Sequence, residues 1–274
     1  MHIETKAIHA GRRFDPLTGA VWIPLHTPNS NLPRYPLQIV PLIAPDIWTR
    51  HPDFHLFSIT VRQAQVQAAA SPALSDLLEE AEASVMQENA ERDAHIAAWG
   101  EAYRGFGAKP NRTPCSAAAL LKRSQKDGAL PRISPLVDAY NAISVLYGVP
   151  VGGEDLDRYS GSPRLVVASG TEPFDTNQNG EKIIEHPDAG EIVWCDNEGV
   201  TCRRWNWRQG RRTMITAESR SLWLVLEALG PMAPPRLQEA GTRLTDVITD
   251  LCPEVEIATS HVDRITAVQS AQMS

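Results

Sequence analysis

Hydrophobic and polar positions along the chain predict a mixture of strands and helices. Residues 54–61 alternate between two sets of side chains, as a strand does. From Ser71 or Ser75 to about Tyr103, apolar residues recur at the spacing of one long amphipathic helix, which is expected to end at the glycines near 105–107. The same criteria predict helices at 115–124, 135–147, 217–229 and 235–251, and strands at 37–44, 164–169, 191–195, 200–207 and 255–258. This order indicates an α+β fold with a largely antiparallel sheet flanked by helices.

The first 37 residues differ from the rest. Five prolines among short apolar stretches exclude long helices and predict an extended arm. The stretch IETKAIHAGRRFDPLTGAVWIPLHT resembles the opening of the cystathionine γ-synthase family of PLP enzymes. None of the five lysines lies in the strand-and-loop setting that a PLP Schiff base needs. We therefore expect an arm at 1–37 without PLP chemistry, a domain at 38–260, a polar tail at 261–274, and no cofactor.

Composition excludes several classes of protein. With 42% hydrophobic and 22% charged residues, the chain is ordinary for a globular protein. No apolar run reaches the roughly 18–20 residues needed to cross a bilayer, and the N-terminus lacks the apolar region of a signal peptide. The four cysteines show no CxxC spacing, so neither a zinc ribbon nor a disulfide scaffold is indicated. We expect a reduced, cytoplasmic protein without a metal site.

Positive charge is concentrated in two stretches. The formal net charge is −7, yet residues 104–132 carry seven basic residues against one acid, and residues 202–216 carry five against none. These stretches together hold +11 (7 − 1 + 5), which leaves −18 elsewhere. Salt screens charges beyond about 8–10 Å, so a basic face on an acidic protein can bind phosphates. Solvated helix faces are the alternative interpretation of the same charges.

Common catalytic motifs are absent: there is no GxSxG, Walker A, HExxH or GxGxxG. In segment 137–157, a polar helix face precedes a Pro-Gly-Gly turn, where glycines let backbone N–H groups approach a ligand. Segment 202–209 interleaves tryptophans with arginines and an asparagine, a composition suited to single-stranded RNA. A plain tight turn and a strand with Trp205 and Trp207 packed on one face are the structural alternatives.

Several motifs in order carry a second resemblance. They are KPNRTPCSAAALLKR, LPRISPLVDAYNAISVLYGVPVGGEDLDRYSG, RLVVASGTEPFD, DAGEIVWCDNEGVTCRRWNWRQ and TMITAES. Over roughly 40–252 the chain resembles the freestanding B3/B4-domain proteins, which are similar to the editing domain of the phenylalanyl-tRNA synthetase β subunit. The resemblance implies the B3/B4 fold and, as function, hydrolysis of wrongly charged aminoacyl-tRNA.

Such an activity has a physical rationale. A binding pocket separates side chains that differ by one methylene by only about 1–3 kcal/mol, so a second, hydrolytic site must remove the errors. The aminoacyl ester is already activated, and a positioned water with oxyanion donors suffices for its hydrolysis. The absence of a catalytic triad is therefore compatible with an enzyme.

The resemblance also implies particular site residues. Asn141 and Glu227 fall where the synthetase editing site has an asparagine lining the pocket and a glutamate that helps to hold the substrate or water. Gly152 falls where the synthetase has a histidine, a departure that puts its specificity and its water activation in doubt here. A solvent-facing position on helix 217–229 is the alternative for Glu227.

The resulting hypothesis is a metal-independent deacylase that acts on mischarged tRNA. Its predicted catalytic residues are Asn141, Gly152, Gly153 and Glu227, with the two glycine N–H groups as oxyanion donors. Substrate contacts are assigned to Tyr140, Trp205, Asn206 and Trp207. The tRNA contacts are assigned to Lys109, Arg112, Lys122, Arg123, Arg204, Arg208, Arg211 and Arg212. A non-catalytic RNA-binding module and a small-molecule amino-acid binder or hydrolase remain alternatives.

Overall fold

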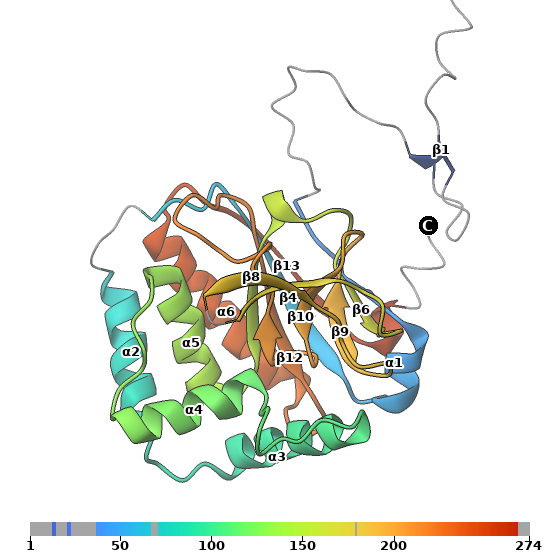
Figure 1. Ribbon diagram of the computed structural model, residues 1–274. Coiled ribbons are helices and arrows are strands. Elements are labelled where there is room, and N and C mark those ends of the chain that lie inside the picture. The colour runs from blue at the N-terminus through green and yellow to red at the C-terminus, as the bar shows by residue number, and fades with distance from the viewer. Residues whose placement is uncertain (1–12, 15–20, 23–36, 67–70, 179, 268–274) are drawn as a thin grey trace, which may run out of the picture.

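The computed structural model describes residues 13–14, 21–22, 37–66, 71–178 and 180–267 (Figure 1). Its helices are α1 (Pro45–Arg50), α2 (Pro72–Ser84), α3 (Ala90–Gly105), α4 (Ser116–Asp127), α5 (Pro135–Tyr147) and α6 (Pro234–Leu251), with a 3-10 turn at Leu156–Arg158. Its strands are β1 (Arg13–Phe14), β2 (Val21–Trp22), β3 (Leu42–Ile43), β4 (His55–Arg62), β5 (Val151–Asp155), β6 (Arg164–Val167), β7 (Phe174–Gln178), β8 (Glu181–Glu185), β9 (Ile192–Cys195), β10 (Val200–Arg203), β11 (Arg208–Gln209), β12 (Leu222–Ala228) and β13 (Glu256–Val262).

A four-stranded antiparallel sheet in the order β13-β4-β12-β5 forms the middle layer. Helices α2, α5 and α6 cover one of its faces (Figure 1). Side chains alternate across a strand, so Leu222, Leu224 and Leu226 of β12 enter the core beneath these helices. Trp223 and Val225 of the same strand enter a second core on the other face. Apolar burial on both sides makes β12 the central strand of the fold.

The second core lies between the two sheets. The larger sheet has the order β3-β6-β9-β10-β7-β8, with β11 paired to β10. Two of its pairings, β3 with β6 and β10 with β7, are parallel and the rest are antiparallel. Trp99 of α3, Trp194 of β9 and Trp223 of β12 meet in the second core. The α+β fold with a largely antiparallel sheet flanked by helices is thus confirmed.

Several predicted elements are also confirmed. The predicted helix 135–147 is α5, which ends at Gly148 with φ of 65°. A Cβ at Gly148 would lie 2.4 Å from Arg92 Cγ, so both the left-handed conformation and the close packing require glycine. The predicted helices 115–124 and 235–251 correspond to α4 and α6.

The long helix predicted from Ser71 to Tyr103 is wrong, because α2 and α3 are separate. Ser71 Oγ caps α2 and Asn89 Oδ1 caps α3. Between the two helices, the buried Arg92 guanidinium donates to Ser84 O at 3.0 Å and Gln87 O at 2.7 Å. Arg92 thereby satisfies carbonyl groups that an uninterrupted helix would bond internally.

The predicted helix 217–229 is also wrong, because the segment contains strand β12. A short apolar run buried on both faces has no period that separates a strand from a helix. The predicted strand 37–44 shrinks to β3 and is followed by α1, and the predicted strand 200–207 ends at Arg203. The Pro-Gly-Gly segment predicted as a turn is strand β5.

Of the predicted arm at 1–37, the structure describes β1, β2 and Leu37, and its other positions lie outside the described residues. At the other end, β13 continues to Val262, one residue beyond the position where the tail was predicted to begin. Residues 268–274 of that tail also lie outside the described residues. No helix among the described residues has the length and apolarity needed to cross a bilayer.

Candidate functional site

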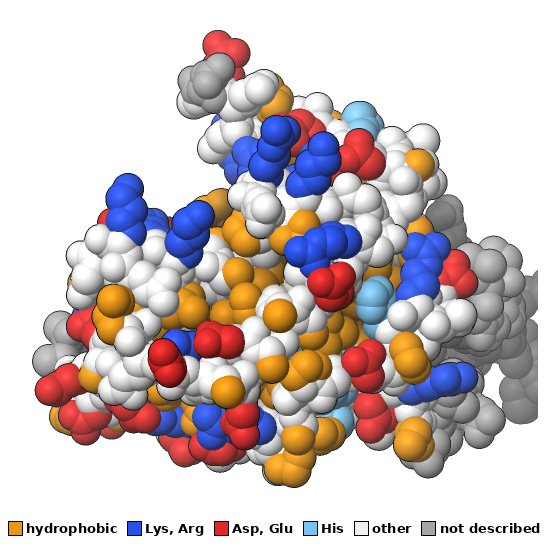
Figure 2. Space-filling model, turned by 90° about the horizontal axis from the view of Figure 1, so that it is seen from below, with side chains coloured by type: hydrophobic (Ala, Val, Ile, Leu, Met, Phe, Trp, Pro, Cys, Tyr) orange, Lys and Arg blue, Asp and Glu red, His pale blue; other side chains and the backbone are white. Residues whose placement is uncertain are grey.

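A cavity of about 180 Å³ lies at the second core. It is lined by Ser116, Tyr140, Val151, Gly152, Gly153, Glu154, Trp194, Cys202, Trp205, Asn206, Trp207, Arg208, Gln209, Trp223, Val225 and Glu227. These residues come from β5, β9–β12, the start of α4, the middle of α5 and the 204–207 turn. Seen from below, the protein has exposed hydrophobic side chains around a hollow and Lys and Arg side chains near its margin (Figure 2).

The sheet register explains which side chains face this cavity. On β12, Trp223 and Val225 lie opposite Glu154 and Gly152 of β5. Cross-strand partners share a face, and residues two apart on a strand do too. Glu227 therefore projects from the same face as Trp223 and Val225. Glu154 and Glu227 thus place two carboxyl groups on the face of the sheet that borders the cavity.

Glu227 is 1% exposed and accepts two side-chain hydrogen bonds. Its Oε1 accepts from Trp194 Nε1 at 3.0 Å, and its Oε2 accepts from Asn206 Nδ2 at 3.1 Å. Asn206 Oδ1 in turn accepts from the Tyr103 hydroxyl at 2.9 Å. Burial raises the pKa of Glu227 to about 8, although the donors Asn206 and Trp194 oppose the shift. The structure places this residue on a central strand, so the solvent-facing helical alternative is wrong.

Glu154 is a second buried carboxyl group at the cavity, and sequence reasoning missed it. It is 4% exposed, and its Oε2 accepts from Gln209 Nε2 at 2.9 Å. The same Nε2 atom donates to Gly153 O at 2.6 Å. Burial raises the pKa of Glu154 to about 8. No Lys or Arg of the described residues forms a salt bridge with either Glu154 or Glu227.

The 204–207 turn carries three of the predicted substrate-contacting residues. Arg204 and Trp205 have φ values of 47° and 65°, a left-handed conformation that is unusual for large side chains. Trp205 is fully buried, and its ring packs edge-on against Phe54 and Trp99. The conformation thus brings Trp205, Asn206 and Trp207 to one cavity, in place of the predicted strand.

Trp207 is half-buried at the cavity. The guanidinium carbon of Arg204 lies 4.4 Å from the Trp207 ring centroid, and that of Arg208 lies 5.9 Å from it. Both arrangements are within the range of cation–π attraction. Asn206 O accepts from Ser116 N at 3.1 Å, which ties the turn to the start of α4. Ser116 Oγ is buried without a hydrogen-bond partner among the described residues.

The two predicted oxyanion donors, Gly152 and Gly153, lie on β5 at an edge of its sheet. Glu227 N donates to Pro150 O at 3.1 Å, and residues two apart repeat the same hydrogen-bonding orientation in an antiparallel pair. The backbone polar groups of Gly152 therefore face β12, whereas those of Gly153 face the outer edge, where Glu154 forms an isolated bridge with Met214 and Gly153 O accepts from Gln209 Nε2. Of these two glycines, Gly153 is the one whose N–H points away from the ladder.

Asn141 lies outside the set of cavity-lining residues, on a partly buried position of α5. Its neighbour Tyr140 lines the cavity, as predicted for a substrate contact. A Cβ at Gly153 would lie 3.1 Å from Tyr140 Cε1, so the Tyr140 ring packs directly on β5. Burial raises the pKa of the Tyr140 hydroxyl to about 12.

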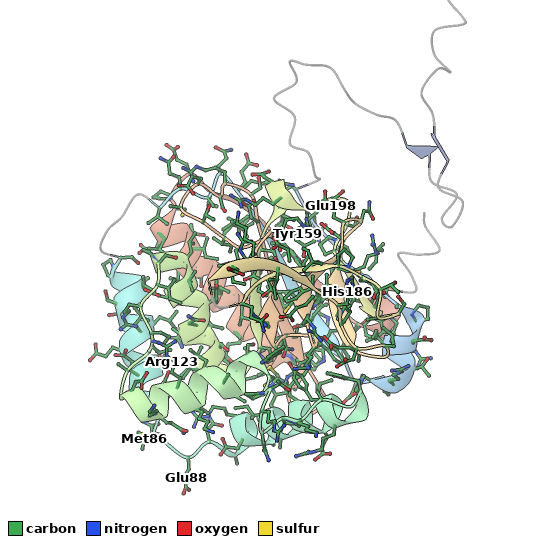
Figure 3. All side chains as sticks on the ribbon, viewed as in Figure 1. Met86, Glu88, Arg123, Tyr159, His186 and Glu198 are labelled. Carbon is green, nitrogen blue, oxygen red and sulfur yellow. The ribbon has the colours of Figure 1, made fainter. Side chains whose placement is uncertain are left out.

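The predicted phosphate-binding residues divide into two groups. Arg204, Arg208, Arg211 and Arg212 each form a salt bridge with an acidic side chain, at distances between 2.7 and 3.9 Å. Lys109, Arg112 and Lys122 are exposed and form no salt bridge among the described residues. Arg123 projects from α4 and pairs with Asp127 on the surface, where such pairs contribute little (Figure 3). Among the predicted phosphate-binding residues, those without an acidic partner therefore lie on α4 and the loop before it.

The cysteines offer no activated nucleophile. All four are free thiols. Burial raises the pKa of Cys115 to about 11 and also raises the pKa values of Cys195, Cys202 and Cys252. Among the described residues, no group of three or more His, Cys, Asp or Glu side chains is arranged to hold a metal ion.

Sequence reasoning also missed Trp194, Trp223, Gln209 and Ser116 at the cavity. Gln209 lies just beyond the Trp205–Trp207 motif, and Glu154 lies directly after the two glycines. Their positions next to predicted site residues in the sequence could have identified them. No such indication pointed to Trp223, because its segment was predicted as a helix.

Comparison with known proteins identifies the family. Residues 98–253 match the family model described as B3/4 domain, so the chain belongs to the B3/4 domain family. This match confirms the predicted resemblance. No curated protein matches the chain.

One solved structure that matches the chain is an N-terminal fragment of the phenylalanyl-tRNA synthetase beta-subunit from Pyrococcus horikoshii. The two share 11% sequence identity with a TM-score of 0.40. The similarity covers 82% of this chain and 53% of that chain. This chain therefore spans about half the length of the synthetase fragment.

Proposed function

We propose that this protein is a trans-editing deacylase that hydrolyses the ester of mischarged aminoacyl-tRNA and releases the free amino acid and tRNA. Membership of the B3/4 domain family supports a role related to aminoacyl-tRNA synthesis. The observation that carries the proposal is the cavity between the sheets, in which two buried carboxyl groups and several aromatic rings surround about 180 Å³. That volume suits a small group such as an aminoacyl side chain.

The chemistry asked of the site is modest. The aminoacyl ester is activated, so hydrolysis requires an oriented water and stabilisation of the negative charge that develops on the carbonyl oxygen. Gly153 N–H faces away from the sheet ladder and is the proposed donor to that oxygen. Trp205 and Tyr140 form walls for the amino-acid side chain, and Glu227 holds Asn206 in place. The half-buried Trp207 ring offers a stacking face for the terminal adenine.

The tRNA would approach along α4 and the loop that precedes it. Lys109, Arg112, Lys122 and Arg123 are exposed there, whereas the arginines of the 202–216 stretch are held by acidic partners. Phosphate contacts by this group should give a binding constant that falls steeply with salt. The Lys122→Ala variant should reduce the slope of log K against log salt by about one unit. Lys182→Ala, which removes an exposed lysine of β8, is the matched control, and an equal change in both variants would contradict the assignment.

The test of catalysis is release of labelled amino acid from a panel of mischarged tRNAs. Wild type should release amino acid from some members and not others. Gly153→Pro removes the proposed donor N–H and should lower the rate about 10²- to 10³-fold. Gly153→Ala keeps the N–H but adds a Cβ that crowds Ile215 and Leu224, so it is the control for crowding, and its folded fraction should retain most of the rate. Equal rates for the proline and alanine variants would remove Gly153 from the mechanism.

The second candidate is a non-catalytic RNA-binding module. Glycine at position 152, where the synthetase editing domain has a histidine, is the observation that favours it. Background release from every tRNA in the panel, with tRNA still bound, would support this alternative and overturn the deacylase. Failure to bind tRNA at all would instead favour a protein that acts on small amino-acid derivatives.

A further inference from the structure

The two carboxyl groups at the cavity are not equivalent. Both oxygens of Glu227 accept hydrogen bonds from side chains that form the cavity wall, Trp194 and Asn206. Asn206 belongs to the 204–207 turn and is also held by Tyr103. Glu227 therefore ties β12 to β9 and to that turn. Its hydrogen-bonding capacity is directed largely at the protein itself.

Glu154 has a different set of partners. Its Oε2 accepts from Gln209, a residue that also donates to the backbone of β5, and the hydroxyl groups of Thr213 and Thr201 also favour its charged form. Across the strand pair, the neighbour of Glu154 is Trp223, and the Tyr140 ring packs on the preceding residue. The Glu154 carboxyl group is thus held by neutral donors, beside aromatic rings, at the wall of the cavity.

Three other buried carboxyl groups of the protein have a cationic partner, whereas Asp138 instead accepts from the backbone N–H of Ile133 at 2.7 Å. Glu191 pairs with Arg203 at 2.8 Å, Asp196 pairs with Arg212 at 2.7 Å, and Asp155 pairs with Arg158 at 3.3 Å. Glu154 is 4% exposed and forms no salt bridge among the described residues, and the charge of Arg212 only partly opposes the rise that burial causes in its pKa. A buried carboxylate without a cation is strongly disfavoured, and a positively charged ligand would supply the missing partner. Aromatic faces nearby would add cation–π attraction.

We propose that Glu154 binds a positively charged nitrogen of the aminoacyl group, whereas Glu227 is a positioning residue that holds the 204–207 turn. The proposal rests on the proposed function for the nature of the ligand. The positive nitrogen has two possible sources in an aminoacyl ester, the α-ammonium group and a cationic side chain. Either would donate to the Glu154 carboxylate, and a neutral Glu154 carboxyl would release its proton to water as the cation entered.

The experiment uses small probes that the protein cannot consume as esters. They are leucinamide, N-acetyl-leucinamide, argininamide and N-acetyl-argininamide, and their binding to the full chain is followed by fluorescence of the tryptophans at the cavity. If the α-ammonium group is bound, acetylation should weaken both amides about 10- to 100-fold. If a cationic side chain is bound, both arginine probes should bind and both leucine probes should be weaker by a similar factor.

Variants then identify the carboxylate. Glu154→Gln keeps the shape but removes the charge, and it should abolish whichever preference wild type shows. Glu154→Asp keeps the charge and should retain part of the preference for the cationic probe. This result would show that the loss in Glu154→Gln comes from the missing charge and not from misfolding. Glu227→Gln should alter the tryptophan signal and overall affinity while it keeps the preference. Glu88→Gln, whose side chain points away from the protein on the α2–α3 loop, is the matched control (Figure 3).

Three results would overturn the proposal. They are no saturable binding of any cationic probe at millimolar concentration, an unchanged preference in Glu154→Gln, and loss of the preference in Glu227→Gln with its retention in Glu154→Gln. Deacylation of mischarged tRNA is measured separately. A protein that binds the cationic probes through Glu154 but hydrolyses no aminoacyl-tRNA would overturn the proposed function alone.

Discussion

The two faces of the four-stranded sheet are built from the same strands but serve different purposes. On the face under α2, α5 and α6, β12 contributes Leu222, Leu224 and Leu226 to a continuous apolar core. On the opposite face, β12 and β5 place Glu227 and Glu154 at a cavity, and both carboxyl groups are almost fully buried. A period of two separates these sets along each strand.

The difference shows that the buried ionisable groups of the sheet lie on the face that borders the cavity. An apolar face stabilises the domain through close packing, and any void there is destabilising. The cavity face leaves space unfilled and buries two ionisable groups, and both features oppose folding. The free energy gained by packing the helix-covered core therefore has to offset the cost of the cavity and its buried carboxyl groups. This division predicts how each face should respond to substitution.

The largest expected effect follows from truncation on the helix-covered face. Leu226 is fully buried there, and Leu226→Ala should lower the free energy of unfolding by about 2–5 kcal/mol. The cost combines lost transfer free energy with a new cavity in a packed core. Urea unfolding followed by circular dichroism measures the change.

A matched valine pair tests whether the two faces really differ. Val61→Ala removes two methyl groups on the helix-covered face, and Val225→Ala removes the same two at the cavity. Val61→Ala should be the more destabilising, because the neighbours of Val225 already border empty space. A greater loss of stability for Val225→Ala would mean that the cavity face is packed as tightly as the other.

The pH dependence of stability should come from the cavity face. Burial raises the pKa values of Glu154 and Glu227 to about 8, from ordinary values near 4.5, so the folded protein binds more protons than the unfolded chain between these limits. Their stabilising contribution is fully present below about pH 4.5 and is lost as pH rises through 8. The loss amounts to at most about 1.4 kcal/mol per pH unit for each group.

The measurement compares variants, because other groups titrate as well. Burial lowers the pKa of His95 to about 4, so His95 makes stability rise with pH over the range from 4 to 6.5. The difference between wild type and Glu154→Gln cancels this contribution. Urea midpoints at pH 5, 6, 7 and 8 should fall more steeply for wild type than for Glu154→Gln. Parallel curves would show that Glu154 has an ordinary pKa.

The fold could be predicted from the sequence where a segment has one buried face. Helices α4, α5 and α6 have clear termination signals or a single apolar stripe, and they were found close to their observed positions. Strand β12 was assigned to a helix, since burial on both faces removes the alternation that marks a strand. The break between α2 and α3 depends on Arg92, a basic residue whose burial is set by tertiary contacts rather than by local pattern.

The site was predicted in part, for a related reason. The Trp205–Trp207 motif and the paired glycines drew attention through their unusual local composition, and they do reach one cavity. Glu154 and Trp223 join that cavity only through the register of β5 with β12, which is a long-range property. Four arginines after Cys202 were assigned to tRNA, because the sequence does not show that strand pairing brings acidic partners to them, such as Glu191 to Arg204 and Asp175 to Arg211.

The smallest expected effect is that of Gly152→Ala, compared with Gly153→Ala on the other face of β5. A Cβ at Gly153 would lie 2.9 Å from Ile215 Cδ1 and 3.0 Å from Leu224 Cδ2, on the packed side. A Cβ at Gly152 would meet Val225 Cγ1 at 3.3 Å and no other atom within 4 Å. Gly153→Ala should therefore destabilise by about 1–3 kcal/mol, whereas Gly152→Ala should change stability by less than about 0.5 kcal/mol.

Thermal unfolding of the two alanine variants in parallel measures the contrast. The added methyl group is the same in both, and so is the reduction in unfolded-state entropy, so the difference between the variants reports on the two faces alone. Gly152→Ala should leave the midpoint near that of wild type, because the new methyl group enters the cavity. A large loss of stability for Gly152→Ala, equal to that of Gly153→Ala, would show that the space beside Gly152 is filled in solution.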